Sequence, residues 1–181
     1  MKHSCLWSKL SERDEGYLLD FFIGDGNIFI KESNGQYRVR MFCNKRETKI
    51  IAKVGDLLRQ VCDNVREYVV ENDGTIVLRV HSKALVGILR SKVDKDKTLK
   101  TLEFPEETGI GLIEGLIDSD GYIRRKYVEI TSSRKKKLAD QVREMLSLFL
   151  VESNLRETTT GKSHVYRIGF SQNIFHPIKA N

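Results

Sequence analysis

The sequence has little proline, with two residues in 181, no low-complexity tract and no apolar run long enough to span a bilayer. The missing apolar run argues against a transmembrane helix, and residues 1–16 lack the apolar core of a secretion signal. The composition, 40% hydrophobic and 31% charged, is typical of a globular protein. We therefore expect one domain or two small ones, working away from membranes.

Cysteine and histidine are also scarce. The three cysteines (Cys5, Cys43 and Cys62) are odd in number and widely spaced, so we expect buried or free thiols in a reducing compartment. The four histidines form no zinc-finger or H-E-x-x-H pattern. Zinc fingers, zincins and histidine-centred nucleases are therefore unsupported.

Positive charge is concentrated rather than spread. The chain carries a net charge of +6, and the segment from Gly121 to Lys137 holds seven basic residues against a single acid, Glu129. Such a strip is typical of a surface that binds a phosphate backbone, although an ordinary charged face in solvent would show the same charge pattern. Charge alone leaves both interpretations open.

An internal repeat says more about the fold than the charge does. Residues 16–28, GYLLDFFIGDGNI, align with residues 111–123, GLIEGLIDSDGYI, at an offset of 95, which sets Asp25 on Asp120 and Gly26 on Gly121. The likeness continues downstream at an offset of 88. The pattern indicates two units of roughly 70–80 residues each. We place them at residues 11–91 and 105–178, joined by a linker over 92–104.

Each unit reads as α-β-β-α-β-β-(α), so we predict an α+β fold. Two pseudo-symmetric units would each form an antiparallel, saddle-shaped sheet with helices on one face, joined at a central two-helix interface. The first helices begin at Ser11, a predicted N-cap, and near Pro105. They end at the Asp-Gly pairs, where we expect a left-handed glycine. Further helices are predicted at 47–64, 82–91 and 136–151, with hairpin turns at 34–35, 72–74 and 160–161.

The sheet face away from the helices carries basic residues. Polar and apolar residues alternate along 37–41, as in a β-strand, which puts Arg38 and Arg40 on one side of the strand. An ordinary solvent-facing sheet would mix the two signs of charge more evenly, so we favour a face that binds double-stranded DNA. The predicted DNA-binding residues are Lys31, Arg38, Arg40, Arg79, Arg124, Arg125, Lys126, Lys135, Arg156 and Arg167.

Small residues spaced by four indicate where the units meet. Gly111, Gly115 and Ser119 share one helix stripe, which lets two helix backbones approach closely. If the two repeated helices pack together, Asp25 and Asp120 lie side by side. Two close carboxylates repel unless a cation stands between them, and hard divalent ions prefer oxygen ligands. A single Asp-Gly would be only a turn signal, but two equivalent copies favour a metal site.

These residues carry a resemblance to a known family. LLDFFIGDG (18–26) and IEGLIDSDG (113–121) resemble the signature of the LAGLIDADG homing endonucleases. Two motifs in one chain are similar to the monomeric class that is common among intron-encoded archaeal enzymes. The first motif has Asp20 where the signature has glycine, and we expect Asp20 to be solvated or paired. We interpret Asp118 as a support residue at the helix end, and not as a metal ligand.

The resemblance implies a function. Such enzymes bind a long DNA site as monomers and cut each strand once, with Mg²⁺ or Mn²⁺, leaving short 3′ overhangs. It implies that Asp25 and Asp120 bind the metal, assisted by the carbonyls of Gly24 and Ser119. Catalytic side chains would follow the second strand of each unit. The candidates are Asn44, Lys45, Ser133 and Arg134, with Arg46 and Lys135 as neighbouring alternatives. We expect a cytoplasmic location, associated with a prokaryotic nucleoid, or an organellar one.

Two other functions stay open. An RNA maturase of the same family would assist the splicing of its host intron and could do so without its metal-binding acids. Both acids are kept here, which favours cleavage. A DNA-binding module without activity would need neither Asp25 nor Asp120. The sequence does not predict the target site or the host element.

Overall fold

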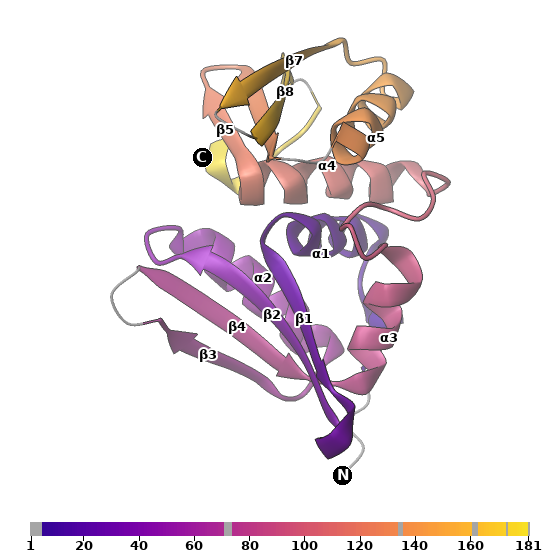
Figure 1. Ribbon diagram of the computed structural model, residues 1–181, viewed down its shortest axis with the longest axis vertical. Helices are drawn as coiled ribbons and strands as arrows, with labels where there is room; N and C mark the ends of the chain where they lie inside the picture. The colour runs from indigo at the N-terminus through magenta and orange to yellow at the C-terminus, as the bar shows by residue number, and fades with distance from the viewer. Residues whose placement is uncertain (1–4, 71–73, 134–135, 161–162, 173, 181) are drawn as a thin grey trace.

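The computed structural model describes residues 5–70, 74–133, 136–160, 163–172 and 174–180. Two four-stranded antiparallel sheets lie on either side of a central pair of helices, α1 and α4 (Figure 1). This arrangement confirms the predicted α+β fold of two pseudo-symmetric units. In the part of the chain that the structure describes, no helix is both long and apolar enough to cross a membrane.

Each half repeats one order of elements. The N-terminal half contains α1 (Glu12–Asp25), β1 (Gly26–Lys31), β2 (Gln36–Asn44), α2 (Thr48–Val61), β3 (Val65–Val69), β4 (Thr75–His81) and α3 (Lys83–Lys92). The C-terminal half contains α4 (Glu106–Asp120), β5 (Gly121–Arg124), β6 (Tyr127–Ser133), α5 (Lys136–Leu148), β7 (Ser153–Thr160) and β8 (Ser163–Ser171). Short 3₁₀ segments are η1 (Trp7–Lys9), η2 (Glu32–Asn34) and η3 (Ile178–Ala180). The sheet orders, β1-β2-β4-β3 and β5-β6-β8-β7, correspond strand for strand.

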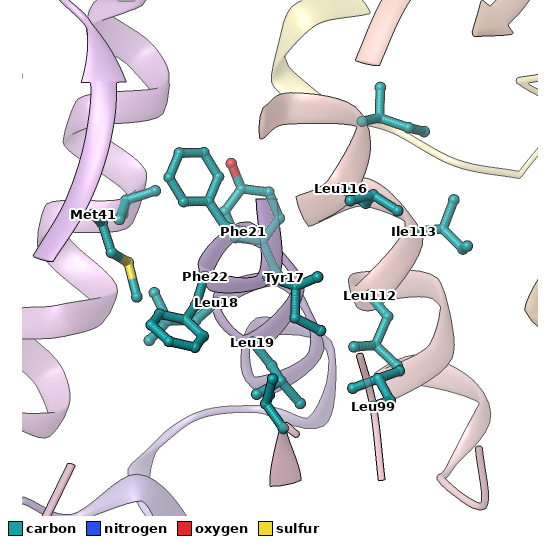
Figure 2. Packing of buried hydrophobic residues seen from close by; sticks show 14 of the residues in the cluster. Tyr17, Leu18, Leu19, Phe21, Phe22, Met41, Leu99, Leu112, Ile113 and Leu116 are labelled. Atoms are coloured by element: carbon teal, nitrogen blue, oxygen red, sulfur yellow. The ribbon is translucent and has the colours of Figure 1, made fainter. Parts of the chain in front are cut away.

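Helices α1 and α4 are buried on nearly every side. Their buried stretches, 16–23 and 108–118, lie between the two sheets and against each other. In Figure 2 the labelled side chains of α1 lie between Met41 of β2 and the leucines of α4. A helix with almost no face toward water gains from apolar residues all round, which explains why apolar residues surround the few acids of both repeated motifs.

Glycines allow the two helix backbones to touch, as the small-residue stripe predicts. A Cβ on Gly111 would overlap the carbonyl oxygen of Arg13, and one on Gly16 would overlap that of Thr108. A Cβ on Gly115 would overlap the carbonyl oxygen of Tyr17. The close crossing brings the C-terminal ends of α1 and α4 together.

The helix ends confirm one prediction and correct another. Ser11 is the N-cap of α1, and its hydroxyl accepts a hydrogen bond from Asp14 N at 3.2 Å. Gly26 and Gly121, however, are extended rather than left-handed, with φ of −96° and −88°. Their missing side chains serve close packing, because a Cβ would lie 2.5 Å from the carbonyl oxygens of Phe22 and Ile117 respectively. The chain therefore passes straight from each motif helix into a strand.

Other boundaries shift by a few residues. Pro105 is the N-cap of α4 rather than its first helical residue, α2 ends at Val61 and α5 at Leu148. The predicted turn at 34–35 is present, with Gly35 left-handed at φ 61°. Residues 72–73 and Gly161 of the other predicted turns lie outside the described residues.

The expectation of unpaired thiols is wrong for two of the three cysteines. Cys5 and Cys62 form a disulfide, whereas Cys43 is a free, buried thiol. An antiparallel bridge pairs Cys5 with Cys62, and Leu6 N donates to Val61 O at 2.9 Å. This pairing attaches the N-terminal segment to the end of α2. The contact joins residues 57 apart, a distance at which spacing carries no signal.

Candidate active site

The C-terminal ends of the two motif helices are in contact. Asp25 is the last residue of α1, and Asp120 is the last residue of α4. A Cβ on Gly24 would overlap Ser119 Oγ and would lie 3.2 Å from Asp120 Oδ2. The structure thus brings the four predicted metal-binding residues into one place, with Asp25 partly buried and Asp120 exposed.

The charges at this site act on one another, because Asp25 lies near a second acid, Asp120, and two lysines, Lys97 and Lys179. Burial and the neighbouring charge of Asp120 raise the pKa of Asp25, while Lys179 and Lys97 lower it, and the net result is a pKa of about 6. A carboxylate that resists ionisation near a second acid is stabilised by any cation placed between them. A cation bound beside Asp25 would therefore have to displace a proton below about pH 6.

Two lysines that the sequence patterns do not predict face the predicted carbonyl ligands. Lys97 Nζ donates to the carbonyl oxygens of Ile23 and Gly24, each at 3.2 Å. Lys179 Nζ donates to those of Ser119, at 3.1 Å, and Gly121, at 3.3 Å. Each helix end leaves carbonyls without intrahelical partners, and in each half an ammonium group binds them. The equivalent carbonyls of Gly24 and Ser119 thus each accept a hydrogen bond from a lysine ammonium group.

The residues that carry these lysines are not equivalent. Lys97 lies in the segment between the two halves, in a turn closed by hydrogen bonds from Lys97 N to Asp94 O and from Asp94 N to Thr98 O. It is left-handed, at φ 59°. The same segment is attached to α5, because the Gln141 amide binds both backbone groups of Leu99. The predicted linker therefore shapes the site.

The donor atoms suit a hard divalent cation. Among the described residues no group of three or more His, Cys, Asp or Glu side chains converges. The carboxylates at the joined helix ends are those of Asp25 and Asp120. Magnesium commonly uses one or two carboxylates and keeps several waters or phosphate oxygens. Asp25, Asp120 and the two carbonyls fit that pattern.

The predicted polar residues after β2 lie in the open. Asn44 and Lys45 are exposed; Asn44 Oδ1 accepts from Arg46 N at 3.0 Å, and Lys45 N donates to Gly74 O at 2.9 Å. In the second half, Arg134 and Lys135 lie outside the described residues, as does the side chain of Ser133. Their catalytic role stays a prediction.

Asp20 contradicts the expectation that it is solvated or paired. It is fully buried, and neither carboxylate oxygen has a hydrogen-bond partner. Burial raises its pKa well above the ordinary value, and the charge of Asp120 adds to the effect. The aspartate that replaces the motif's glycine therefore keeps its proton to a higher pH in the native protein than in the unfolded chain.

We expect Asp20→Ala to stabilise the protein at neutral and alkaline pH, by about 2 kcal/mol. Above about pH 4 the unfolded chain releases the Asp20 proton, whereas the native protein retains it to a higher pH, so the free energy of unfolding falls as pH rises between the two pKa values. The variant loses that slope. Urea unfolding between pH 4 and pH 8 measures it, with Asp56→Ala, at an exposed position, as the control. Equal slopes in wild type and Asp20→Ala would contradict the assignment.

The first sheet has a basic face on the side away from the helices. The registry places Arg40 beside both Asn27 and Arg79, and Arg38 beside Phe29. Alternation puts the predicted residues Lys31, Arg38, Arg40 and Arg79 on this one face. Arg66 of β3, which pairs with Arg79, joins them and was not predicted.

Aromatic rings hold three of these arginines in place. The guanidinium of Arg38 lies 5.3 Å from the Phe29 ring centre, that of Arg40 5.7 Å from Phe42, and that of Arg79 4.9 Å from Tyr68. Such cation–π contacts orient a guanidinium before any ligand arrives. Sequence alternation could have found the aromatics, because they share the parity of the arginines on their strands.

The second sheet presents a similar face. The registry places Arg156 beside Arg167, and Arg124 beside Tyr127, on the side away from α5. Arg125 and Lys126 instead form the exposed turn between β5 and β6, at the rim of the face. Exposed Tyr122 and Tyr127 add aromatic surface.

Comparison with known proteins supports the same architecture. Residues 107–174 match a family model described as a LAGLIDADG-like domain. The structure is similar to the crystal structure of I-DmoI with DNA and Mn, with TM-score 0.67 and 24% identity, covering 87% of this chain and 89% of that one. I-DmoI with DNA and Ca gives TM-score 0.66 and 22% identity over 88% and 83% of the chains.

A more distant structure shares the fold. The N-terminal LAGLIDADG domain of DUF199/WhiA is 12% identical, with TM-score 0.55 over 88% of this chain and 75% of that one. Comparison with curated protein sequences gave no significant match. At these identities the structural likeness establishes the fold.

Proposed function

We propose that this protein is a site-specific DNA endonuclease of the LAGLIDADG homing type. It would bind a long duplex as a monomer and make a metal-dependent double-strand break with short 3′ overhangs. The observation that carries the proposal is the meeting of the two motif helices at Asp25 and Asp120, between two basic sheet faces. The similarity to I-DmoI structures with DNA and divalent metals supports it.

The chain's own groups suggest how the reaction would run. Asp25, Asp120 and the carbonyls of Gly24 and Ser119 would hold Mg²⁺ or Mn²⁺. A bound ion of this kind activates water and stabilises the leaving oxygen of a phosphodiester. Lys97 and Lys179 keep positive charge beside the same carbonyls, where it would stabilise charge developing on the phosphate. Asn44, Lys45 and Arg134 stay proposed as groups that order water.

The two faces would share the work of recognition. Arginines fixed over aromatic rings are suited to guanine edges in the major groove, whereas Arg125 and Lys126 at the turn are suited to phosphates. Because both halves belong to one chain, the site would be asymmetric. The domain boundaries at 11–91, 92–104 and 105–178, an intron-encoded archaeal origin and a cytoplasmic or organellar location belong to the same proposal.

A selection experiment identifies the target site and tests the proposal together. Random duplexes bound by the protein in Ca²⁺ would be enriched, and the recovered site cloned into a plasmid. We expect the wild type to linearise this plasmid when Mg²⁺ or Mn²⁺ is added and not in EDTA, with 3′ overhangs at the ends. Specific binding without cleavage would overturn the nuclease in favour of a DNA-binding module. Promotion of intron splicing without DNA cleavage would favour the maturase.

Binding should depend steeply on salt. Phosphate contacts release counterions, so we expect affinity to fall about 10³-fold or more between about 50 and 200 mM salt. Arg40→Gln, on the open face, should weaken binding about 10-fold, because it removes a guanidinium from the DNA face. Arg59→Gln, at an exposed site on α2, is the matched control and should change neither affinity nor slope. Fluorescence anisotropy at several salt concentrations measures both, and a flat salt response would exclude the basic-face assignment.

A further inference from the structure

The last part of the chain is fastened across the end of α4. Residues 174–180, the C-terminal strap, bind two carboxylates of that helix (Figure 1, yellow). His176 N donates to Glu114 Oε1 at 2.6 Å. Ile178 N and Lys179 N each donate to Asp118, one to each oxygen, at 2.9 Å. The strap is therefore held by its backbone.

Both carboxylates are buried and also bind α1. Glu114 is 2% exposed and Asp118 is 1% exposed. Arg13 donates to both oxygens of Glu114, through Nη2 at 2.5 Å and Nε at 3.1 Å. The Tyr17 hydroxyl donates to Asp118 at 2.9 Å. Each acid thus joins both motif helices to the strap, and neither is left without partners.

The strap is also anchored by packing. Phe175 is fully buried and meets the rings of Phe149 and Phe170 edge to face, with centroids 5.9 and 6.0 Å away. Such aromatic contacts contribute beyond the apolar area they bury. Phe175 fixes the start of the strap, and Asp118 fixes its end.

This attachment sets the position of Lys179. Because adjacent backbone N–H groups bind separate oxygens of Asp118, the main chain at Lys179 has one orientation. From there the ammonium group reaches the carbonyls of Ser119 and Gly121, and lies 3.6 Å from Glu47 of the other half. Its charge lowers the pKa of Asp25, which burial and Asp120 raise.

Among the described residues, the first half has no such device. The repeat aligns Glu114 with Leu19 and Asp118 with Ile23, and both of those residues are buried and apolar. Its lysine, Lys97, arrives by the turn between the two halves. The second motif therefore carries its extra acids, Glu114 and Asp118, in the half whose lysine is held by the strap.

We propose that Asp118, assisted by Glu114, is a positioning residue that acts through the strap to place the Lys179 ammonium in the active site. The proposal rests on the proposed nuclease function for its catalytic consequence. Asp118 itself touches neither metal nor DNA in this scheme. It explains why the second motif has Asp118 where the first motif has Ile23.

The experiment uses the full chain with Asp118→Asn, Lys179→Met and the double variant. Amide hydrogen exchange should show at least about 10-fold faster exchange at Ile178 and Lys179 in Asp118→Asn, with core amides of α1 and α4 unchanged. On the selected plasmid site, Lys179→Met should slow single-turnover cleavage about 10²-fold, and Asp118→Asn similarly. If Asp118 acts through Lys179, the double variant is no slower than Lys179→Met alone.

The controls separate the possible failures. Asp140→Asn, on the exposed face of α5, should match the wild type in both measurements. If Asp118→Asn unfolds, Ile178→Pro removes one strap N–H while keeping Asp118, and should speed amide exchange at Lys179 and slow cleavage in the same way. Wild-type protein that does not cleave refutes the nuclease, while the exchange measurement still tests the strap. Additive rate losses, or unchanged exchange at 178 and 179, would overturn the positioning role.

Discussion

Asp25→Asn and Asp120→Asn should each slow double-strand cleavage by about 10³-fold while leaving DNA affinity nearly unchanged. Each change removes a negative charge from the place where the ends of α1 and α4 meet, and so should weaken binding of the proposed cation, which would activate water. In the proposed function DNA affinity comes from the two sheet faces, which neither variant alters. The expected outcome is a protein that binds its site and does not linearise the plasmid.

The measurement pairs cleavage with metal binding. Single-turnover cleavage of the selected plasmid site gives the rates, and titration with Mn²⁺ followed by electron paramagnetic resonance gives the metal affinity. Asp140→Asn removes an exposed carboxylate of α5 and should behave as wild type in both. Full cleavage by the Asp25→Asn, Asp120→Asn double variant would refute the two-aspartate mechanism.

The fold and the meeting of the two acids were predictable because both follow from the repeat. Local patterns set the elements, and two like units with small residues on their first helices have few ways to pack. The close contact of Gly24 with Ser119 and Asp120 follows from that symmetry. The arginine face was equally accessible, since strand alternation alone assigns a residue to one side of a sheet.

The features that were missed depend on segments outside the repeat. Lys97 lies in the turn between the halves and Lys179 in the strap, so no alignment pairs them, although they bind equivalent carbonyls. The Cys5–Cys62 disulfide joins a segment before the first unit to the end of α2. Only three-dimensional proximity reveals such contacts.

Asp20 lies inside the repeat, yet its environment was still predicted wrongly. The alignment correctly flags it as an acid in a glycine position, yet a side chain that breaks a pattern suggests solvation or pairing. Its burial without partners follows from its place on a helix enclosed on all sides. Local rules fail there because tight packing of α1 on α4 overrides the preference of a carboxylate for water.

Gly111→Ala should be among the most destabilising single changes in the chain, lowering the free energy of unfolding by about 3 kcal/mol or more. The added Cβ overlaps the carbonyl oxygen of Arg13 and lies 2.9 Å from Tyr17 N. These are backbone atoms of α1, so no side-chain rotation relieves the clash, and the helices must separate. Separation would also move Asp25 away from Asp120, and cleavage should fall with stability.

Gly87→Ala is the matched control, because it makes the same change in a helix without the clash. Gly87 lies on the exposed side of α3, and a Cβ there would meet nothing within 4 Å. Alanine should therefore stabilise the protein by about 0.5–1 kcal/mol through helix propensity. Urea unfolding followed by circular dichroism compares the two variants. If Gly111→Ala shifts the midpoint no more than Gly87→Ala does, the two helix backbones are not in contact. The ends of α1 and α4 would then not be held together, and the proposed site between them would be refuted.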